Sequence, residues 1–162
     1  VTLCASCALH LKNAYIDLLV ETKDIENAAV KKFSNKVTTS SIIINEHIKT
    51  GKTNNDQSIT FHTPCHLKGI KDGKECAKKV IELTGANIID ADEENTCCGF
   101  GGSYSVKHPE ISSQILDKKI NDFIKTGADI IATECPGCIL QLKGGMKNKG
   151  LKVVVRHIAE LL

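Results

Sequence analysis

Short apolar runs alternate with longer amphipathic stretches through the second two-thirds of the chain. Such runs predict buried strands, and apolar residues spaced three or four positions apart predict helices with one face on a core. The predicted strands are 59–62, 87–90, 128–133 and 151–155. The predicted helices are 72–84, 109–126, 139–147 and a last turn or two at 158–162. Strand–helix alternation with short turns predicts an α/β fold, a Rossmann-like parallel sheet of about four strands flanked by helices.

The first fifty or so residues follow a helical pattern instead. Residues 9–20 are apolar at most positions, which predicts a mostly buried helix, and residues 23–34 predict a more polar one. The predicted apolar face of the second helix consists of Ile25, Ala28, Ala29 and Phe33. A short strand at 37–39 and a helix from Ser40 or Ser41 to about Lys49 complete this N-terminal helical segment. The polar stretch 50–58 then breaks the pattern.

The motif at the start of the chain recurs near its end. Residues 2–12 and 133–143 both fit T-x-C-x-x-C-x-L-x-L-K, so that Cys4 and Cys7 correspond to Cys135 and Cys138. The offset indicates a repeat unit of about 130 residues. We therefore expect a piece of a longer polypeptide, in which residues 1–52 are the C-terminal part of a first copy and residues 58–162 a complete second copy.

Composition narrows the classes of function. The chain has 162 residues with 21 basic and 19 acidic side chains, a net charge of +2, which gives no electrostatic reason to expect a nucleic-acid partner. Its apolar runs are too short for a transmembrane segment. Eight cysteines include an adjacent pair and two CxxC pairs, a spacing that suits metals better than disulfides. We therefore expect a cytoplasmic, metal-binding protein.

Five of the cysteines follow predicted strands. Cys65 comes after the first strand, Cys97 and Cys98 lie in the loop after the second, and Cys135 and Cys138 follow the third. The carboxyl ends of parallel strands meet at one edge of the sheet, which is where ligands collect in such folds. We therefore expect these five sulfur atoms to gather in one crevice.

The neighbours of these cysteines suit an anionic metal centre. Gly99, Gly101 and Gly102 let the backbone approach a ligand closely and donate N–H groups to it, and His66 could hydrogen-bond a sulfur atom. Five thiolates could not stay charged together without a polycation among them. Soft thiolates select iron–sulfur clusters, zinc or copper(I).

The spacing C-x31-C-C-G-x35-C-x-x-C, from Cys65 to Cys138, resembles the cysteine-rich CCG domain family. Proteins with this domain, usually in two copies, include the cysteine-rich component of heterodisulfide reductase, the glycolate oxidase iron–sulfur subunit and lactate-utilisation iron–sulfur proteins. The stretches CCGFGGSY, HPEIS and HIAELL are most similar to the glycolate and lactate oxidase subunits.

The resemblance implies an electron-transfer iron–sulfur subunit of a 2-hydroxyacid (glycolate or lactate) oxidoreductase complex. Its cluster, an ordinary [4Fe–4S] or a non-cubane one, would take its ligands from the same five cysteines: Cys65, Cys97, Cys98, Cys135 and Cys138. Gly99, Gly101, Gly102 and His66 would line the cluster. Electrons would come from an FAD-containing dehydrogenase subunit and pass to a quinone or another carrier, in the cytoplasm or at the inner face of the membrane.

Two alternatives remain open at this point. One is a disulfide-reducing cluster domain of the heterodisulfide reductase type. The other is a structural zinc-binding interaction module, for which four of the five sulfur atoms would make a closed tetrahedral site.

The other cysteines receive weaker expectations. Cys4 and Cys7 lack partners in this chain, so we expect them to be free, disulfide-linked or bound to adventitious metal, and to serve the first copy's cluster in the longer protein. Cys76 lies in a predicted helix with Val80 and Leu83 on the same side and is expected in the core. His62 flanks the Cys65 loop, where capping the loop and hydrogen-bonding a sulfur atom are both open roles.

Overall fold

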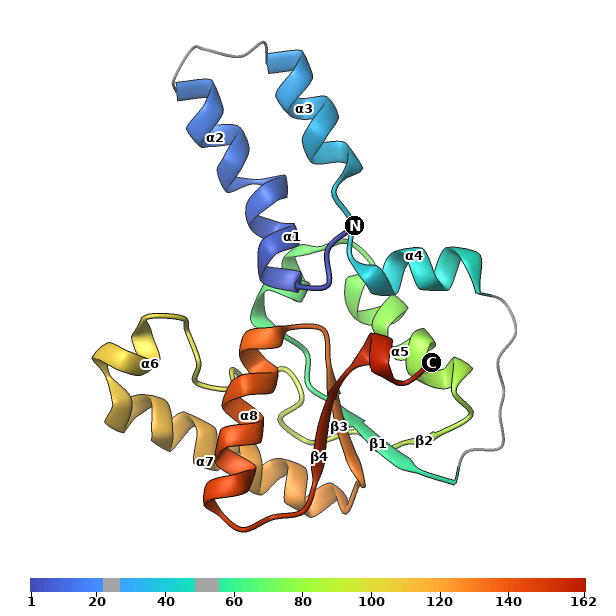
Figure 1. Cartoon of the computed structure of the whole chain (residues 1–162), viewed down its shortest axis with the longest axis vertical. Coiled ribbons are helices and arrows are strands. Elements are labelled where there is room, and N and C mark those ends of the chain that lie inside the picture. The colour runs from blue at the N-terminus through green and yellow to red at the C-terminus, as the bar shows by residue number, and fades with distance from the viewer. Residues whose placement is uncertain (22–26, 49–55) are drawn as a thin grey trace.

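The computed structural model describes residues 1–21, 27–48 and 56–162. Its centre is a four-stranded sheet in the order β2-β1-β3-β4, in which every pairing is parallel (Figure 1). The strands are β1 (Ser58–Phe61), β2 (Asn87–Ile88), β3 (Ile130–Thr133) and β4 (Val154–His157). The predicted fold class and the predicted parallel pairing of about four strands are therefore confirmed.

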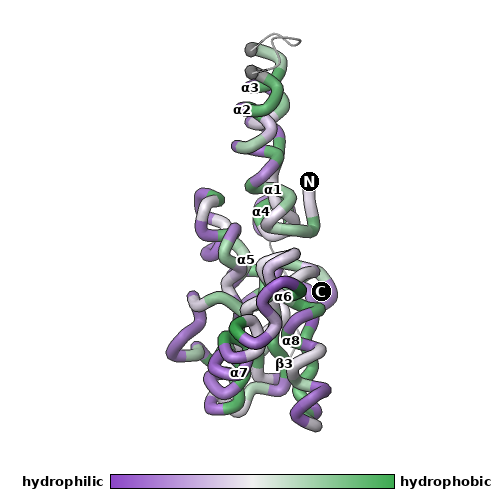
Figure 2. The backbone as a smooth tube through the Cα atoms, turned by 90° about the vertical axis from the view of Figure 1, so that its left-hand side faces the viewer, coloured by the Kyte–Doolittle hydropathy of each residue, from purple (hydrophilic) through white to green (hydrophobic). Residues whose placement is uncertain are grey.

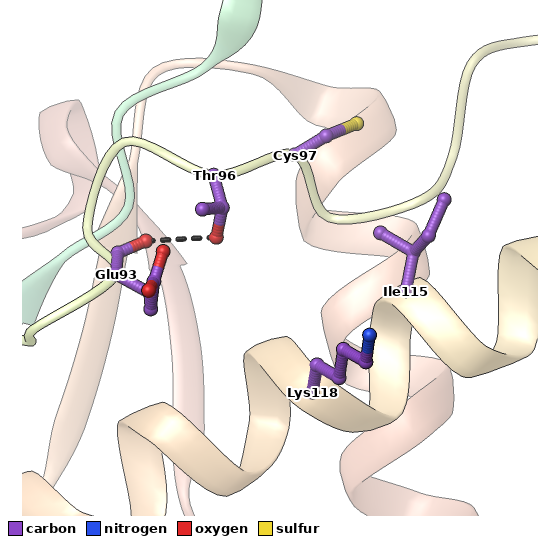
Figure 3. A pocket seen from close by; sticks show the side chains of 5 residues that line it. All are labelled: Glu93, Thr96, Cys97, Ile115 and Lys118. Carbon is purple, nitrogen blue, oxygen red and sulfur yellow. Dashed lines mark hydrogen bonds between the residues drawn. The ribbon is translucent and has the colours of Figure 1, made fainter.

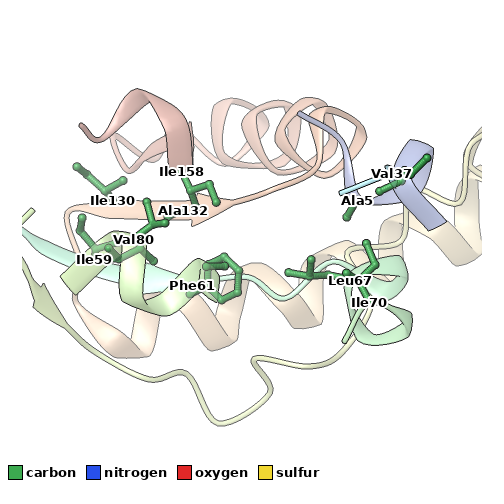
Figure 4. Close-up of a cluster of buried hydrophobic side chains, with 13 residues drawn as sticks. Ala5, Val37, Ile59, Phe61, Leu67, Ile70, Val80, Ile130, Ala132 and Ile158 are labelled. Atoms are coloured by element: carbon green, nitrogen blue, oxygen red, sulfur yellow. The ribbon is translucent and has the colours of Figure 1, made fainter. Parts of the chain in front are cut away.

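Helices cover both faces of the sheet. On one face, α5 (Gly73–Leu83) packs against Ile59, Phe61 and Ala132 in a first core, much of which is drawn in Figure 4. On the other face, α7 (Pro109–Thr126) and α8 (Pro136–Asn148) enclose Ile131 and Val155 in a second core. Both cores are built because side chains alternate between the two faces of each strand. Short helical turns complete the domain at η1 (Cys65–Gly69), α6 (Tyr104–Lys107) and η2 (Ile158–Glu160).

The N-terminal segment consists of α1 (Ala5–Lys12), α2 (Ala14–Glu21), α3 (Asn27–Lys36) and α4 (Ser40–His47). Helices α1 and α4 lie against the domain, and Ala5, Ala8 and Val37 belong to the first core. Helices α2 and α3 run side by side away from the domain (Figure 1), and Figure 2 shows hydrophobic positions along this projecting pair.

The projecting pair corrects two predictions. The helix predicted at 9–20 is interrupted at Asn13, and its second part is not mostly buried, since Tyr15 is 46% and Leu18 57% exposed. In α3 the buried side chains are Val30 and Ser34, whereas the predicted face is wrong: Ala28, Ala29 and Phe33 are exposed, and Ile25 lies outside the described residues. The physical reason is that no sheet lies beneath these two helices, so their apolar side chains have little to pack against.

Several predicted boundaries also shift. Residues 37–39 form one parallel bridge, Thr2 with Thr39, rather than a strand. Helix α8 begins at Pro136, before the predicted start at 139, and β4 begins at Val154 rather than 151. Helix α4 ends at His47 rather than at about Lys49. Residues 49–55, which include most of the predicted polar stretch 50–58, lie outside the described part. In contrast, α7 occupies the predicted 109–126, because Pro109 starts it and Gly127 adopts a positive φ of 66° at its end.

The described helices were also compared with the requirements of a membrane span. Among residues 1–21, 27–48 and 56–162, no helix is both long and apolar enough to cross a bilayer.

Candidate metal centre

The carboxyl edge of the sheet carries the five cysteines singled out in the sequence. Cys65 begins η1 after β1, Cys135 is the N-cap of α8 after β3, and the loop after β2 brings Cys97 and Cys98 to the same edge. Together with Cys138 they line one pocket of about 540 Å³. The chain thus brings the five side chains together, while their role as metal ligands stays a prediction.

The five cysteines lie at different depths. Cys98 and Cys138 are buried, and their Sγ atoms are only 3.4 Å apart. Cys135 is also buried, whereas Cys65 and Cys97 are exposed at the rim. The pocket therefore has a sulfur-lined floor that water reaches poorly and a sulfur-lined rim that faces solvent.

The thiols perturb one another's ionisation. A hydrogen bond from Cys65, with a second from Cys98, lowers the pKa of Cys97 to about 2, and the backbone N–H of Gly99 also donates to its Sγ at 3.3 Å. The hydrogen bond with Cys138 lowers the pKa of Cys135 to about 5. The hydrogen bond with Cys97 raises the pKa of Cys65, and the hydrogen bond with Cys135 raises the pKa of Cys138. Each thiolate thus depends on a neighbouring protonated thiol, and only a bound cation would let all five ionise.

The glycines after the cysteine pair shape the loop in two ways. Gly99 has a φ of +86°, and a Cβ there would lie 2.6 Å from the carbonyl oxygen of Ser112 on α7. Gly101 and Gly102 also have positive φ and line the pocket, whereas Gly99 is absent from its wall. Gly99 therefore holds the loop against α7, and only the other two predicted glycines border the space itself.

The N-terminal segment contributes to the same pocket, which the sequence did not indicate. Cys4, Ser6 and His10 line it from α1 and its N-cap. The Ser6 hydroxyl lies 2.7 Å from Nδ1 of His66 and 3.8 Å from the Cys135 sulfur. His66, predicted to line the site, is thus placed at its wall. The repeat in the sequence indicated two similar CxxC helices, but nothing in it indicated that they face one space.

A buried carboxylate joins the two parts of the chain. Glu134 is fully buried and accepts hydrogen bonds from the Ser40 hydroxyl at 2.7 Å, the Ser41 backbone N–H at 2.8 Å and the Ser41 hydroxyl at 2.6 Å. Its own carbonyl oxygen accepts from the backbone N–H of Ala5 at 3.0 Å. The N-cap of α4 is Thr39, whereas Ser40 or Ser41 was expected to cap this helix. Both serines instead bind this carboxylate, which sits at the positive end of the helix. Glu134 therefore fixes the N-terminal segment beside Cys135.

His62 lies under the sulfur-lined floor. Its ring is fully buried and neither ring nitrogen has a hydrogen-bond partner. One ring nitrogen and the Sγ atoms of Cys98 and Cys138 all lie within 4.8 Å of one another. Burial lowers the pKa of His62 to about 3, so the imidazole is neutral at physiological pH. The sequence left open whether His62 caps the Cys65 loop or hydrogen-bonds a sulfur atom. It did not indicate that the ring is buried without a hydrogen-bond partner, because that depends on residues distant in the chain.

A second, smaller hollow of about 260 Å³ lies behind Cys97 (Figure 3). Thr96 donates a hydrogen bond to the carbonyl oxygen of Glu93 at 2.9 Å, which folds the loop, while Ile115 and Lys118 of α7 form the opposite wall. Cys97 therefore borders space on two sides.

The donors around the large pocket fit a soft metal. The side chains that line it offer thiols, the His10 and His66 imidazoles and the Ser6 hydroxyl, with no carboxylate among them. The His62 imidazole is not part of this wall but lies within 4.8 Å of the Cys98 and Cys138 sulfur atoms. Calcium and magnesium prefer oxygen ligands, whereas iron in sulfide clusters and zinc prefer sulfur and nitrogen. The residues present thus suit iron–sulfur or zinc chemistry.

The remaining cysteine, predicted to lie in the core, is buried at 9% exposure. Cys76 is buried in α5, and the Asn45 side chain lies 3.7 Å from its sulfur. All eight cysteines are free of disulfide bonds, Cys4 and Cys7 included.

Comparisons with known proteins identify the domain that carries these cysteines. The family described as CCG, cysteine-rich domain, matches residues 59–143, more than half of the chain and a stretch that contains all five cysteines. Lactate utilization protein A 1 of Bacillus mycoides (strain KBAB4) is 35% identical over 107 residues, 65% of this chain and 44% of that protein. Lactate utilization protein A of Shouchella clausii (strain KSM-K16) is 33% identical over 107 residues, 65% of this chain and 45% of that protein.

A third relative, lactate utilization protein A of Bacillus cytotoxicus, is 38% identical over 107 residues, again 65% of this chain and 44% of the relative. The chain spans less than half the length of these curated relatives. From the domain match and the shared cysteine pattern, the chain belongs to the cysteine-rich CCG domain family.

Proposed function

We propose that this chain is part of the electron-transfer iron–sulfur subunit of a 2-hydroxyacid oxidoreductase, with lactate as the first candidate substrate and glycolate as the second. The observation that carries the proposal is the gathering of five cysteines from three strand ends around one pocket. The names of the relatives, lactate utilization protein A, support the choice of substrate.

The cluster would be held by Cys65, Cys97, Cys98, Cys135 and Cys138, as a [4Fe–4S] or non-cubane centre. When bound, it would supply one-electron transfer. The chain's own groups would tune it: the Gly99 backbone N–H donates to the Cys97 sulfur, and the buried floor around Cys98 and Cys138 keeps water away from part of the site.

The partners belong to the same proposal. An FAD-containing dehydrogenase subunit would supply electrons, and a quinone or another carrier would take them, in the cytoplasm or at the inner face of the membrane. The exposed thiols of Cys65 and Cys97 at the rim favour this, since they put the centre within a short distance of a docked protein or carrier.

We also propose that residues 1–52 are the end of a first CCG copy and residues 58–162 a second one. The backbone supports this, since Cys4 and Cys135 have nearly the same dihedral angles, φ −141° and ψ 114° against φ −148° and ψ 113°. Each residue is also the N-cap of a helix.

The full-length protein, purified without oxygen, tests the function. We expect iron and acid-labile sulfide, a paramagnetic-resonance signal that changes on reduction, and reduction by lactate once the flavin subunit is added. Zinc without iron would overturn the proposal in favour of a structural zinc module. Iron and sulfide without reduction by either hydroxyacid would leave an electron-transfer centre with another donor.

A disulfide-reducing centre is the second candidate. The pocket of about 540 Å³ beside the sulfur atoms favours it, because such a reaction needs room for a substrate disulfide next to the metal centre. Reduced full-length protein that converts a small-molecule disulfide to thiols faster than it responds to hydroxyacids would support this second function over the first.

A further inference from the structure

The buried imidazole of His62 is short of partners. In the described residues, the buried side-chain N and O atoms without a hydrogen bond are Thr60 Oγ1, Thr133 Oγ1 and both ring nitrogens of His62. A buried polar atom without a partner is destabilising, so such an atom calls for an explanation such as an ion or a water molecule. A metal ion bound to the His62 ring would give one of its two nitrogen atoms a partner.

The sulfur atoms nearest to this ring are spaced for a metal ion. A ring nitrogen of His62 and the sulfur atoms of Cys98 and Cys138 lie within 4.8 Å of one another, and the two sulfur atoms are 3.4 Å apart. In a tetrahedral site, with metal–sulfur bonds of about 2.3 Å and metal–nitrogen bonds of about 2.0 Å, ligand atoms are roughly 3.5 Å apart. The two sulfur atoms are therefore at the spacing that one ion requires, and a ring nitrogen lies within 4.8 Å of both.

Three separate elements hold these donors in place. His62 follows β1, and its backbone N–H donates to the Ala132 carbonyl at 2.8 Å. Its ring stands edge-on to Phe123 of α7, with centroids 6.0 Å apart. Cys138 lies in the first turn of α8, and Cys98 is buried in the loop after β2. The His62 backbone is held by β3 through Ala132, and its ring packs against Phe123 of α7. The ring therefore has little freedom to turn toward solvent.

Nearby charged groups are already engaged elsewhere. The Lys119 ammonium donates to the Glu93 carbonyl oxygen and lies over the Phe123 ring. The buried carboxylate of Glu94 binds Thr63 and Lys78. Neither side chain is thus free to pair with the His62 ring.

We propose that His62 is a nitrogen ligand of the metal centre and binds the same metal ion as Cys98 and Cys138. The inference rests on the proposed function in that it takes the pocket to hold a metal centre. It adds a neutral ligand to an otherwise thiolate set, so the centre carries less negative charge and a higher reduction potential than one held by thiolates alone.

The experiment uses full-length protein purified without oxygen from cells grown with ¹⁵N-histidine, compared with unlabelled protein. Pulsed paramagnetic resonance of the reduced centre measures magnetic coupling to nitrogen nuclei. We expect a strong nitrogen coupling in the wild type whose frequencies change with the isotope. We expect H62C to keep its iron, lose this coupling and show a lower reduction potential, since a thiolate replaces the imidazole.

The matched control is H66Q, which alters the histidine directly after Cys65 in the pocket wall and should keep the nitrogen coupling. Iron and sulfide without strong histidine coupling in the wild type, or coupling that persists in H62C, would overturn the ligand assignment and leave the proposed function standing. Protein that binds no metal would overturn both.

If the bound metal is zinc, the proposed function fails while the ligand assignment is tested separately. X-ray absorption at the zinc edge should then show one nitrogen ligand beside sulfur in the wild type and sulfur alone in H62C. Four sulfur ligands in the wild-type zinc protein would overturn the assignment.

Discussion

The two CxxC motifs have the same local structure and different surroundings. Cys4 and Cys135 are both extended N-caps, and the threonine two residues before each takes part in parallel pairing, Thr2 with Thr39 and Thr133 with His157. Similar sequences thus build similar turns from strand to helix. In the second motif, Cys138 nevertheless lies beside Cys98, whereas Cys7 of the first motif is exposed to solvent.

The difference extends to the chemistry of the first cysteine in each pair. The hydrogen bond with Cys138 lowers the pKa of Cys135, whereas burial raises the pKa of Cys4. A CxxC turn therefore does not by itself make a thiolate, and the groups that pack around it decide its charge. Substitutions and pH changes can test this contrast between the copies, from the largest expected effect to the smallest.

Metal binding should separate the two copies most clearly. In full-length protein we expect C138S to lose most of the iron from the second copy's centre, because this sulfur lies at the floor of the pocket against Cys98. The change C7S, at the equivalent exposed position, should leave that centre intact. Iron and sulfide analysis with the paramagnetic-resonance signal measures both. Equal losses from this centre in the two variants would show that the copies share one site.

Stability should differ at the residue before the first cysteine of each pair. E134A should lower the free energy of unfolding by about 3 kcal/mol, because it leaves the buried donors of Ser40 and Ser41 without an acceptor. L3A, at the equivalent and 59% exposed position, should change it by no more than about 0.5 kcal/mol. Urea unfolding measures both values. A loss below about 1 kcal/mol in E134A would mean that the carboxylate does not hold the two parts together.

The reactivity of the two N-cap thiols should depend on pH to different extents in metal-free protein. Cys135, with a pKa lowered to about 5, is already a thiolate at pH 6, so its rate of alkylation by iodoacetamide should stay flat between pH 6 and 8. Cys4, whose pKa is raised above the ordinary 9.0, should react about 100-fold faster at pH 8 than at pH 6.

Mass spectrometry of the labelled peptides gives both rates from one sample, so that the two positions control for each other. Parallel pH profiles would contradict the difference in charge between the two copies.

The smallest effect is expected at the contact between the two parts of the pocket wall. S6A removes the hydrogen bond to His66 Nδ1 and should cost about 1 kcal/mol of unfolding free energy. The change S113A on the exposed side of α7 is a control and should be nearly neutral. An S6A protein as stable as the control would indicate that this contact adds nothing to the docking of α1.

Sequence patterns alone determined the sheet, the long helix 109–126 and the meeting of the five cysteines. These follow from local rules: buried strands are apolar, Pro109 and Gly127 suit the two ends of a helix, and parallel strands end at one edge. The five cysteines were predictable because each closely follows or lies in the loop after a strand that the pattern revealed.

Only the tertiary structure decided which groups complete the site. Ser6 meets His66, Glu134 binds Ser40, and His62 is left without a partner, and each of these depends on which residues distant in the chain come into contact. The projecting pair α2 and α3 is a second example. Apolar spacing indicates which face of a helix could be buried, but it does not indicate whether another part of the chain packs against that face. Periodicity is a property of one segment, whereas burial, pairing and charge are set between segments.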